Sequence, residues 1–171
     1  MEIFHKIKVG ENGPDNMKIS ILVVSYNQEA YIHEAIQSIL MQKLDCDFEV
    51  IVADDCSTDN TLSIIIELLS NAGVEFTVLD GGANLGLERN YERGFAACSG
   101  EYIAVMEGDD YWVNSRRLEK HIVFLDEHQE CSMSFNRKIK YFQGINRFSV
   151  DPWLVNEDFC YITIEQLAYA N

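Results

Sequence analysis

Five acidic side chains close two apolar segments and have the type and spacing to hold a divalent cation. Asp54 and Asp55 end the segment FEVIVADD, and Glu107, Asp109 and Asp110 end the segment EYIAVMEGDD. Carboxylates this close repel one another, and burial of the preceding strands adds a desolvation cost. Mg²⁺ and Mn²⁺ prefer carboxylate oxygens and complete their shells with phosphate oxygens and water. A cation would offset the repulsion; the alternative is that these carboxylates are solvated or cap the following helices.

The segments around these acids alternate between strand and helix patterns. Short β-branched apolar runs predict buried strands, and apolar residues that recur on one helical face predict amphipathic helices. The expected strands cover residues 19–26, 48–55, 75–80, 101–110 and 131–142, and the expected helices cover residues 30–43, 60–72, 88–98 and 115–128. This alternation predicts an α/β fold, a three-layer sandwich with a mostly parallel central sheet.

The polar groups fall at the carboxyl ends of the expected strands. Tyr26 follows the first strand, the Asp54–Asp55 pair follows the second, and the cluster from Glu107 to Asp110 follows the fourth. In parallel sheets, ligands bind outside this edge. We therefore expect three strands to deliver these side chains to one binding site.

Length and composition suit a single globular domain. The chain has 171 residues, of which we expect 1–17 to form a polar leader and 18–171 to form the domain. The net charge is −15, and the stretch from Leu44 to Glu88 holds ten acidic residues and no Lys or Arg. Nucleic acid is therefore excluded as the expected partner, because phosphate binding needs a basic face.

The cysteines and the apolar stretches bear on localisation. Five cysteines, an odd number with no CxxC pair, favour reduced thiols in a cytoplasmic protein over a disulfide framework. The sequence contains no run of about eighteen apolar residues, so we expect no membrane-spanning helix. Peripheral attachment at the inner face of the membrane stays open.

Four motifs in order resemble those of a known family. SILVVSYNQEAYIHEAIQSILMQ, FEVIVADDCSTDNT, NLGLERNYERGFAACSGEYIAVMEGDDYW and RRLEKHIVFLDEH follow one another as in the family 2 glycosyltransferases of the GT-A (Rossmann-like) fold. The resemblance is close over residues 18–128 and looser over 129–171. It implies a nucleotide-sugar donor, a Mn²⁺ or Mg²⁺ cofactor, and transfer of a sugar to an acceptor hydroxyl.

The resemblance also implies roles for residues on the nucleotide side of the site. Tyr26 would stack on or flank the donor base. Asp55 would accept a hydrogen bond from the base, with Asp54 supporting it. The segment that usually lines the base and the diphosphate contributes Asn84, Arg89 and Asn90.

The stretch EGDD takes the place of the family's DxD-type motif. By this resemblance Asp109 would contact the ribose or the metal, and Asp110 would contact the metal. Glu107 stands where many members have Asp, so a direct metal contact there is not implied. Tyr111 and Trp112 would either wall an acceptor pocket or pack against the following helix.

The sequence departs from the family at the general base. An inverting transfer needs an acidic or histidine side chain near the acceptor hydroxyl, and members supply it well beyond the DxD motif. Here the segment ITIEQLAYAN resembles the part that precedes the acceptor half, so we expect a truncated donor-binding portion. Glu157 and Asp158 are weak candidates for the base.

The expected function is an inverting glycosyltransferase that acts in surface glycan or polysaccharide synthesis. Its donor would be a UDP-, GDP- or dTDP-linked sugar, and its acceptor a glycan or a lipid-linked molecule. One alternative is a donor-binding module or fragment without turnover. A Mg²⁺-dependent phosphotransfer domain is disfavoured, because receiver domains carry their paired acids after the first strand.

Overall fold

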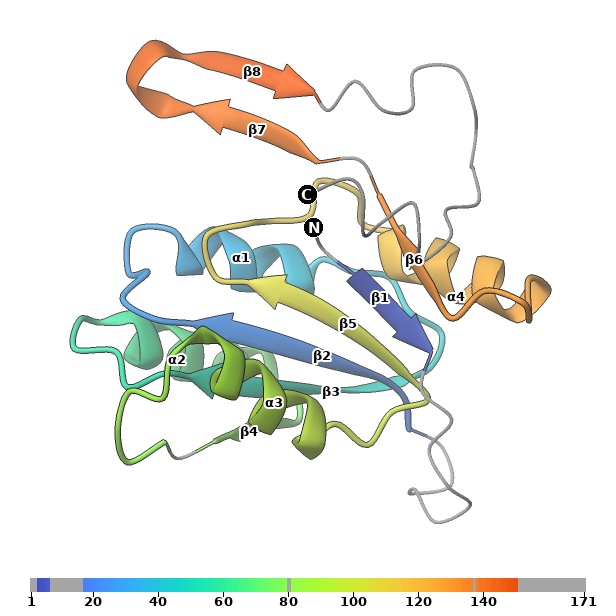
Figure 1. The fold of residues 1–171 in the computed structure, drawn as a ribbon, viewed down its shortest axis with the longest axis horizontal. Coiled ribbons are helices and arrows are strands. Elements are labelled where there is room, and N and C mark those ends of the chain that lie inside the picture. Colours follow the sequence, from blue (N-terminus) through green and yellow to red (C-terminus); the bar gives the residue numbers. More distant parts are fainter. Residues whose placement is uncertain (1–2, 7–16, 80, 137, 151–171) are drawn as a thin grey trace. The chain divides into compact units, whose positions relative to one another are not determined.

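The computed structural model describes residues 3–6, 17–79, 81–136 and 138–150 (Figure 1). These residues fall into two compact units, one that ends at Phe135 and one that begins at Asn136. The described part of the first unit contains a six-stranded sheet and four helices, and that of the second contains a two-stranded hairpin.

The sheet of the first unit is mostly parallel. Its strands are β1 (Ile3–Lys6), β2 (Met17–Ser25), β3 (Asp47–Asp54), β4 (Phe76–Val78), β5 (Tyr102–Glu107) and β6 (Met133–Phe135). They lie in the order β4-β3-β2-β5-β1-β6. Neighbours from β4 to β5 pair in parallel, whereas β1 is antiparallel to both β5 and β6.

Helices cover both faces of this sheet. They are α1 (Ile32–Leu40), α2 (Thr61–Ala72), α3 (Leu87–Ala97) and α4 (Arg117–Glu127). Alternate residues of β2 point to opposite faces, so Ile21 joins the core with α1, α2 and α4, and Leu22 joins the core with α3. Figure 1 shows α3 in front of the sheet and the fainter α1 and α2 behind it. The predicted three-layer α/β sandwich is confirmed.

The close fit of α3 against the sheet depends on a glycine. A Cβ atom at Gly94 would lie 2.5 Å from Leu22 Cδ1, closer than real Cβ contacts come. Gly94 is buried, and its lack of a side chain allows the helix to approach β2. The packing brings the first turn of α3 to the carboxyl edge of the sheet.

Three element predictions differ from the structure. The expected leader contains β1, which pairs between β5 and β6; four residues hold too few alternations for a periodic signal. The expected strand over 131–142 is divided into β6 and β7 (Ile139–Phe142), which belong to different sheets. β7 pairs with the unpredicted β8 (Arg147–Val150).

Two further expectations concern membranes and the chain's last residues. No helix in the described ranges is long and apolar enough to cross a bilayer. The helix expected within ITIEQLAYAN lies outside the described residues, and the domain boundary at residue 18 stays a prediction.

Candidate functional site

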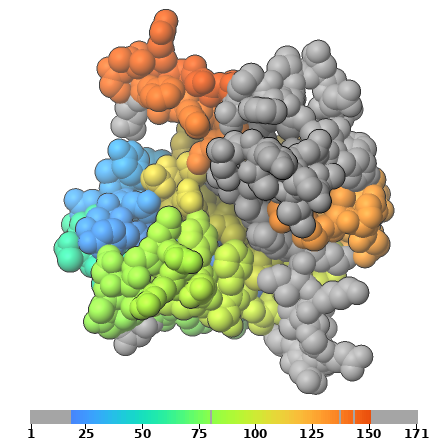
Figure 2. Space-filling model, viewed as in Figure 1, coloured from blue at the N-terminus to red at the C-terminus, as the bar shows by residue number. Residues whose placement is uncertain are grey.

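The carboxyl ends of β2, β3 and β5 lie side by side and open into one pocket. Ser25 pairs with Asp54, and Val24 pairs with Glu107, so the three strands end at nearly the same level. In Figure 2 the blue residues after β2, the green residues of α3 and the yellow residues after β5 meet on this side of the unit. The pocket measures about 370 Å³ and is lined by Val24, Ser25, Tyr26, Gln28, Asp55, Asn84, Gly86, Leu87, Asn90, Glu107 and Asp109.

The predicted site residues divide into three groups. The pocket lining includes five of them: Tyr26, Asp55, Asn84, Asn90 and Asp109. Three are absent from the lining: Asp54, Arg89 and Asp110. Glu157 and Asp158 lie outside the described residues.

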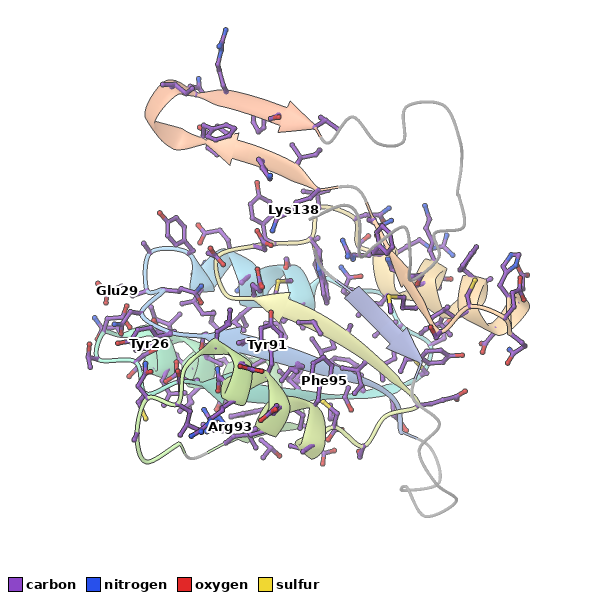
Figure 3. The ribbon with its side chains drawn as sticks, viewed as in Figure 1. Tyr26, Glu29, Tyr91, Arg93, Phe95 and Lys138 are labelled. Carbon is purple, nitrogen blue, oxygen red and sulfur yellow. The ribbon has the colours of Figure 1, made fainter. Side chains whose placement is uncertain are left out.

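Tyr26 presents an aromatic surface to the pocket. It follows β2 directly, and its residue surface is 48% exposed. Figure 3 shows Tyr26 beside the end of β2. An exposed ring on a pocket wall can stack on a planar base, as sequence-tolerant aromatic contacts with bases do.

The Asp54 carboxylate is buried and hydrogen-bonded to other groups of the protein. It is only 4% exposed, and its carboxylate accepts hydrogen bonds from Ser25 Oγ at 2.8 Å, from Ser57 Oγ at 2.5 Å and from the Ser57 backbone amide at 2.8 Å. These donors satisfy the buried charge and fix the turn after β3. The geometry gives Asp54 a structural function at the rim of the site.

Asp55 lines the pocket and also fastens its neighbouring loop. Its two carboxylate oxygens accept the backbone amides of Leu85, at 2.7 Å, and Gly86, at 2.9 Å. Asn84 Nδ2 donates to the Asp55 carbonyl oxygen at 3.2 Å. Gly86 has φ of 83°, a conformation that side-chain-bearing residues rarely adopt. Asp55 therefore sets the path of the chain into α3.

Asn90 and Arg93 form a second internal connection between α3 and β3. Asn90 is buried; its Nδ2 donates to the Ala53 carbonyl at 2.7 Å, and its Oδ1 accepts from Arg93 Nε at 2.8 Å. Arg93 also donates to the carbonyl oxygens of Asp54, at 2.6 Å, and Leu79, at 3.2 Å (Figure 3). Arg93 was not among the predicted site residues, although its place one helical turn after Asn90, on the same face, is visible in the sequence.

The acidic cluster after β5 has three different environments. Glu107 accepts a hydrogen bond from Tyr91 Oη at 2.7 Å and lines the pocket. Burial and the nearby Glu107 raise the pKa of Tyr91 far above its usual value, so the phenol keeps its proton. Asp109 is exposed to the pocket, whereas Asp110 is partly buried and its backbone amide donates to the Glu107 carbonyl.

The two aromatics after the cluster have separate environments. Trp112 is 2% exposed and belongs to the main core, with the Arg117 guanidinium 5.3 Å from its ring centroid. Tyr111 is 55% exposed. Of the two open interpretations, packing therefore holds for Trp112, and an acceptor wall stays open for Tyr111 alone.

Reciprocal hydrogen bonds lock together the loops after β2 and β3. Each segment donates backbone amides to the other's side chains, so the two are joined in both directions. The amides of Asn27, Gln28 and Glu29 donate to the side chains of Ser57, Thr61 and Asp59, and those of Thr58 and Asn60 donate to the side chains of Asn27 and Glu29. Although burial opposes it, hydrogen bonds from Thr61 hold the pKa of Asp59 below its usual value. These hydrogen bonds fix the segments that carry the pocket residues Tyr26, Gln28 and Asp55.

The carboxylates suit a cation shared with a ligand better than a cation held by protein alone. Within the described ranges, no three His, Cys, Asp or Glu side chains gather to hold a metal ion. Asp109 and Glu107 nevertheless present hard oxygen donors to the same pocket. Mg²⁺ and Mn²⁺ bind in this way, through one or two carboxylates with phosphate oxygens and water. The donor set therefore fits a divalent cation that arrives with a phosphorylated ligand.

Comparisons with known proteins identify relatives over most of the chain. The family model described as Glycosyl transferase family 2 matches residues 20–158. The Mycobacterium tuberculosis "Uncharacterized protein Rv1520" is 40% identical over 118 residues, 69% of this chain and 34% of its own length. Poly(ribitol-phosphate) beta-N-acetylglucosaminyltransferase TarS of Staphylococcus aureus is 35% identical over 150 residues, 86% of this chain and 25% of its own length.

Solved structures support the same relationship. The crystal structure of S. aureus TarS 1-349 in complex with UDP-GlcNAc has a TM-score of 0.60 at 36% identity and covers 66% of this chain and 32% of that one. Mannosyltransferase PcManGT from Pyrobaculum calidifontis has a TM-score of 0.58 at 21% identity, which shows the fold alone, over 69% of this chain and 35% of that one. This chain spans about a quarter to a third of these relatives' length. It belongs to the family 2 glycosyltransferases and has their GT-A fold.

Proposed function

We propose that this chain forms the donor-binding part of a glycosyltransferase that transfers a sugar from a nucleotide-diphosphate sugar to an acceptor hydroxyl, with inversion. The observation that carries the proposal is the pocket where three parallel strands end, because it combines an aromatic surface at Tyr26 with carboxylates at Asp55 and Asp109. Family membership supports it, and so does the TarS complex with UDP-GlcNAc.

In this proposal the nucleotide lies between the loops after β2 and β3. Tyr26 flanks the base, and Asp55 accepts a hydrogen bond from it with a lone pair that the loop amides leave unused. Asp54 supports this arrangement through its buried contacts with Ser25 and Ser57. Asn84 and Asn90 border the base and the diphosphate. Arg89 is exposed at the start of α3, where its charge attracts the diphosphate.

A divalent cation, Mn²⁺ or Mg²⁺, would be held at the end of β5. Asp109 is the best-placed ligand, since it faces the pocket, and Asp110 is the second candidate. When bound, the cation supplies Lewis-acid stabilisation of the charge that develops on the leaving nucleoside diphosphate. The solved structure of PcManGT, a mannosyltransferase of the same fold, is in complex with GDP-Man and Mn²⁺.

The transfer itself needs a group beyond the described pocket. The acceptor oxygen bonds to the anomeric carbon, the bond from that carbon to the diphosphate oxygen breaks, and the hydroxyl proton passes to a general base. Glu157 and Asp158 remain candidates for this base. The proposed acceptor is a glycan or lipid-linked molecule in surface glycan or polysaccharide synthesis.

We also propose that the reaction takes place in the cytoplasm, with peripheral contact at the inner face of the membrane. Cys56, Cys98 and Cys131 are free thiols, which suits a reducing compartment. Cell fractionation followed by a high-salt wash tests this assignment. A pool released by salt is the expected result, and a protein found only outside the cell would contradict it.

Calorimetric titration with UDP-, GDP- and dTDP-sugars, each with Mn²⁺ or with EDTA, tests the donor proposal. We expect Mn²⁺-dependent binding of one class, with UDP-sugars favoured by the TarS complex. Absence of binding by all three classes would contradict the proposal. A radiolabelled transfer assay then separates an active enzyme from the second candidate, a donor-binding module without turnover, since the module binds donor and transfers nothing.

A further inference from the structure

We propose that Gln28 is a positioning residue that holds Asp109 in the orientation needed for the cation and the donor diphosphate. The proposal rests on the donor site described above. It assigns a function to a residue that the sequence motifs did not single out.

The backbone of Gln28 is fixed on both sides. Its amide donates to Thr61 Oγ1 at 2.7 Å, which anchors it to the first turn of α2. Its carbonyl accepts the amides of Tyr31 and Ile32, both at 2.9 Å, where α1 begins. The side chain of Gln28 therefore starts from a position that the elements after β2 and β3 determine jointly.

From this position the Gln28 side chain reaches across to the end of β5. Its Nε2 donates to Asp109 Oδ1 at 3.1 Å, and both residues line the pocket. A carboxylate only accepts hydrogen bonds, so the amide nitrogen must face it. Of the hydrogen bonds that the structure gives for the described residues, this is the one that joins the Asp109 carboxylate to another side chain.

The oxygen of the Gln28 amide is tightly packed. Gln28 Oε1 is buried and has no hydrogen-bond partner among the described residues. A Cβ atom at Gly108 would lie 2.3 Å from this oxygen and 2.9 Å from Ile32 Cδ1. The amide fits only because residue 108 is glycine. An unsatisfied buried acceptor is unfavourable in free energy. The amide is nevertheless oriented with Nε2 toward Asp109 and Oε1 unsatisfied.

Thr61, Gln28 and Asp109 thus connect the ends of β3, β2 and β5 in one chain of contacts. Hydrogen bonds to a metal-ligating carboxylate orient it, and their loss commonly weakens metal binding by a factor of 10–100. Gln28 acts through Asp109 and need not touch the ligand itself. The expected consequence is a specific loss of Mn²⁺-dependent binding when the amide is removed.

Gln28→Met, which keeps the side-chain length and removes the donor, tests this function. UDP affinity is measured by calorimetry with Mn²⁺ and with EDTA, and Mn²⁺ affinity is measured by electron paramagnetic resonance with UDP present. We expect Mn²⁺ to bind roughly tenfold more weakly, UDP affinity in EDTA to be unchanged, and the thermal midpoint to be retained. Gln37→Met, at an exposed position of α1, is the matched control and should change none of these values.

Three results would overturn the inference. They are an unchanged Mn²⁺ affinity in Gln28→Met, an equal loss of UDP affinity in EDTA, which indicates direct ligand contact, and a lowered thermal midpoint that accounts for the loss. Gly108→Ala should reproduce the effect by displacing Gln28, and the double variant should lose less than the sum of the two. If the unaltered chain binds none of UDP, GDP and dTDP in the presence of Mn²⁺, the donor proposal fails instead.

Discussion

The two acidic strand ends have similar sequences and different functions in the structure. After β3, three side-chain or backbone donors surround the buried Asp54, and two loop amides bind Asp55. After β5, Asp109 faces the pocket with one hydrogen bond from Gln28. The β3 end mainly builds the site, and the β5 end presents oxygen atoms to a ligand.

The difference shows that acidity at a strand end does not by itself define a ligand site. At the opposite edge of the sheet, Glu49 Oε1 accepts hydrogen bonds from Ser20 Oγ and from both the amide and the hydroxyl of Ser99. Those donors belong to the protein, as they do for Asp54. A carboxylate is available for a cation when the fold leaves its lone pairs facing a pocket.

The largest expected effect is a loss of stability when the buried carboxylate at the β3 end is removed. Asp54→Ala leaves the hydroxyls of Ser25 and Ser57 without their buried acceptor, so we expect the free energy of unfolding to fall by about 3 kcal/mol. Urea denaturation followed by circular dichroism measures this change. Asp109→Ala is the matched variant and should lose less than about 0.5 kcal/mol; equal losses would remove the distinction between the two ends.

The next largest effect is on Mn²⁺-dependent UDP binding, when the carboxylates at the β5 end are removed. Asp109→Ala should weaken Mn²⁺-dependent UDP binding by roughly a hundredfold, because it removes a charged cation ligand, and should leave the EDTA value unchanged. Asp110→Ala should have a smaller effect, since Asp110 is outside the pocket lining. A larger loss in Asp110→Ala would instead favour the metal assignment that the family resemblance implies.

A smaller effect concerns the loop that Asp55 holds. Gly86→Ala places a side chain at φ of 83° in open space, so the cost is backbone strain alone, about 1–2 kcal/mol of stability. Nucleotide affinity should fall severalfold, because the amides bound to Asp55 shift. Gly144→Ala, also in open space but without a positive φ, should be neutral in the same unfolding and titration experiments.

The smallest expected effect concerns the hydrogen bond between Tyr91 and Glu107, whose contribution to stability depends on pH. Burial and Glu107 raise the pKa of Tyr91 in the folded state, so the contribution of this phenol to stability is complete below its unfolded pKa, roughly 10, and declines as the pH rises above it. Tyr91→Phe should cost about 1 kcal/mol at pH 7 and less at pH 10.5. Urea titrations at both pH values measure it, and a difference that grows with pH would contradict the assignment.

Local patterns in the sequence were enough to predict most of the fold. The strands and helices predicted between Ile19 and Glu127 are present in the structure, with small differences in where they begin and end. Short strands failed this test: β1 has four residues, and its place in the sheet depends on pairing with β5, far along the chain. The split between β6 and β7 likewise depends on which sheet each strand joins.

For the site, the sequence by itself determined which carboxylates reach the carboxyl edge, because a parallel α/β order brings consecutive strand ends together. It did not determine which of them remain available. Asp54, Asn90 and Trp112 are engaged by the protein, and Gln28 reaches Asp109 across strands. Only the tertiary structure decided this, because hydrogen-bond partners and burial come from residues distant in sequence and are fixed when the layers pack.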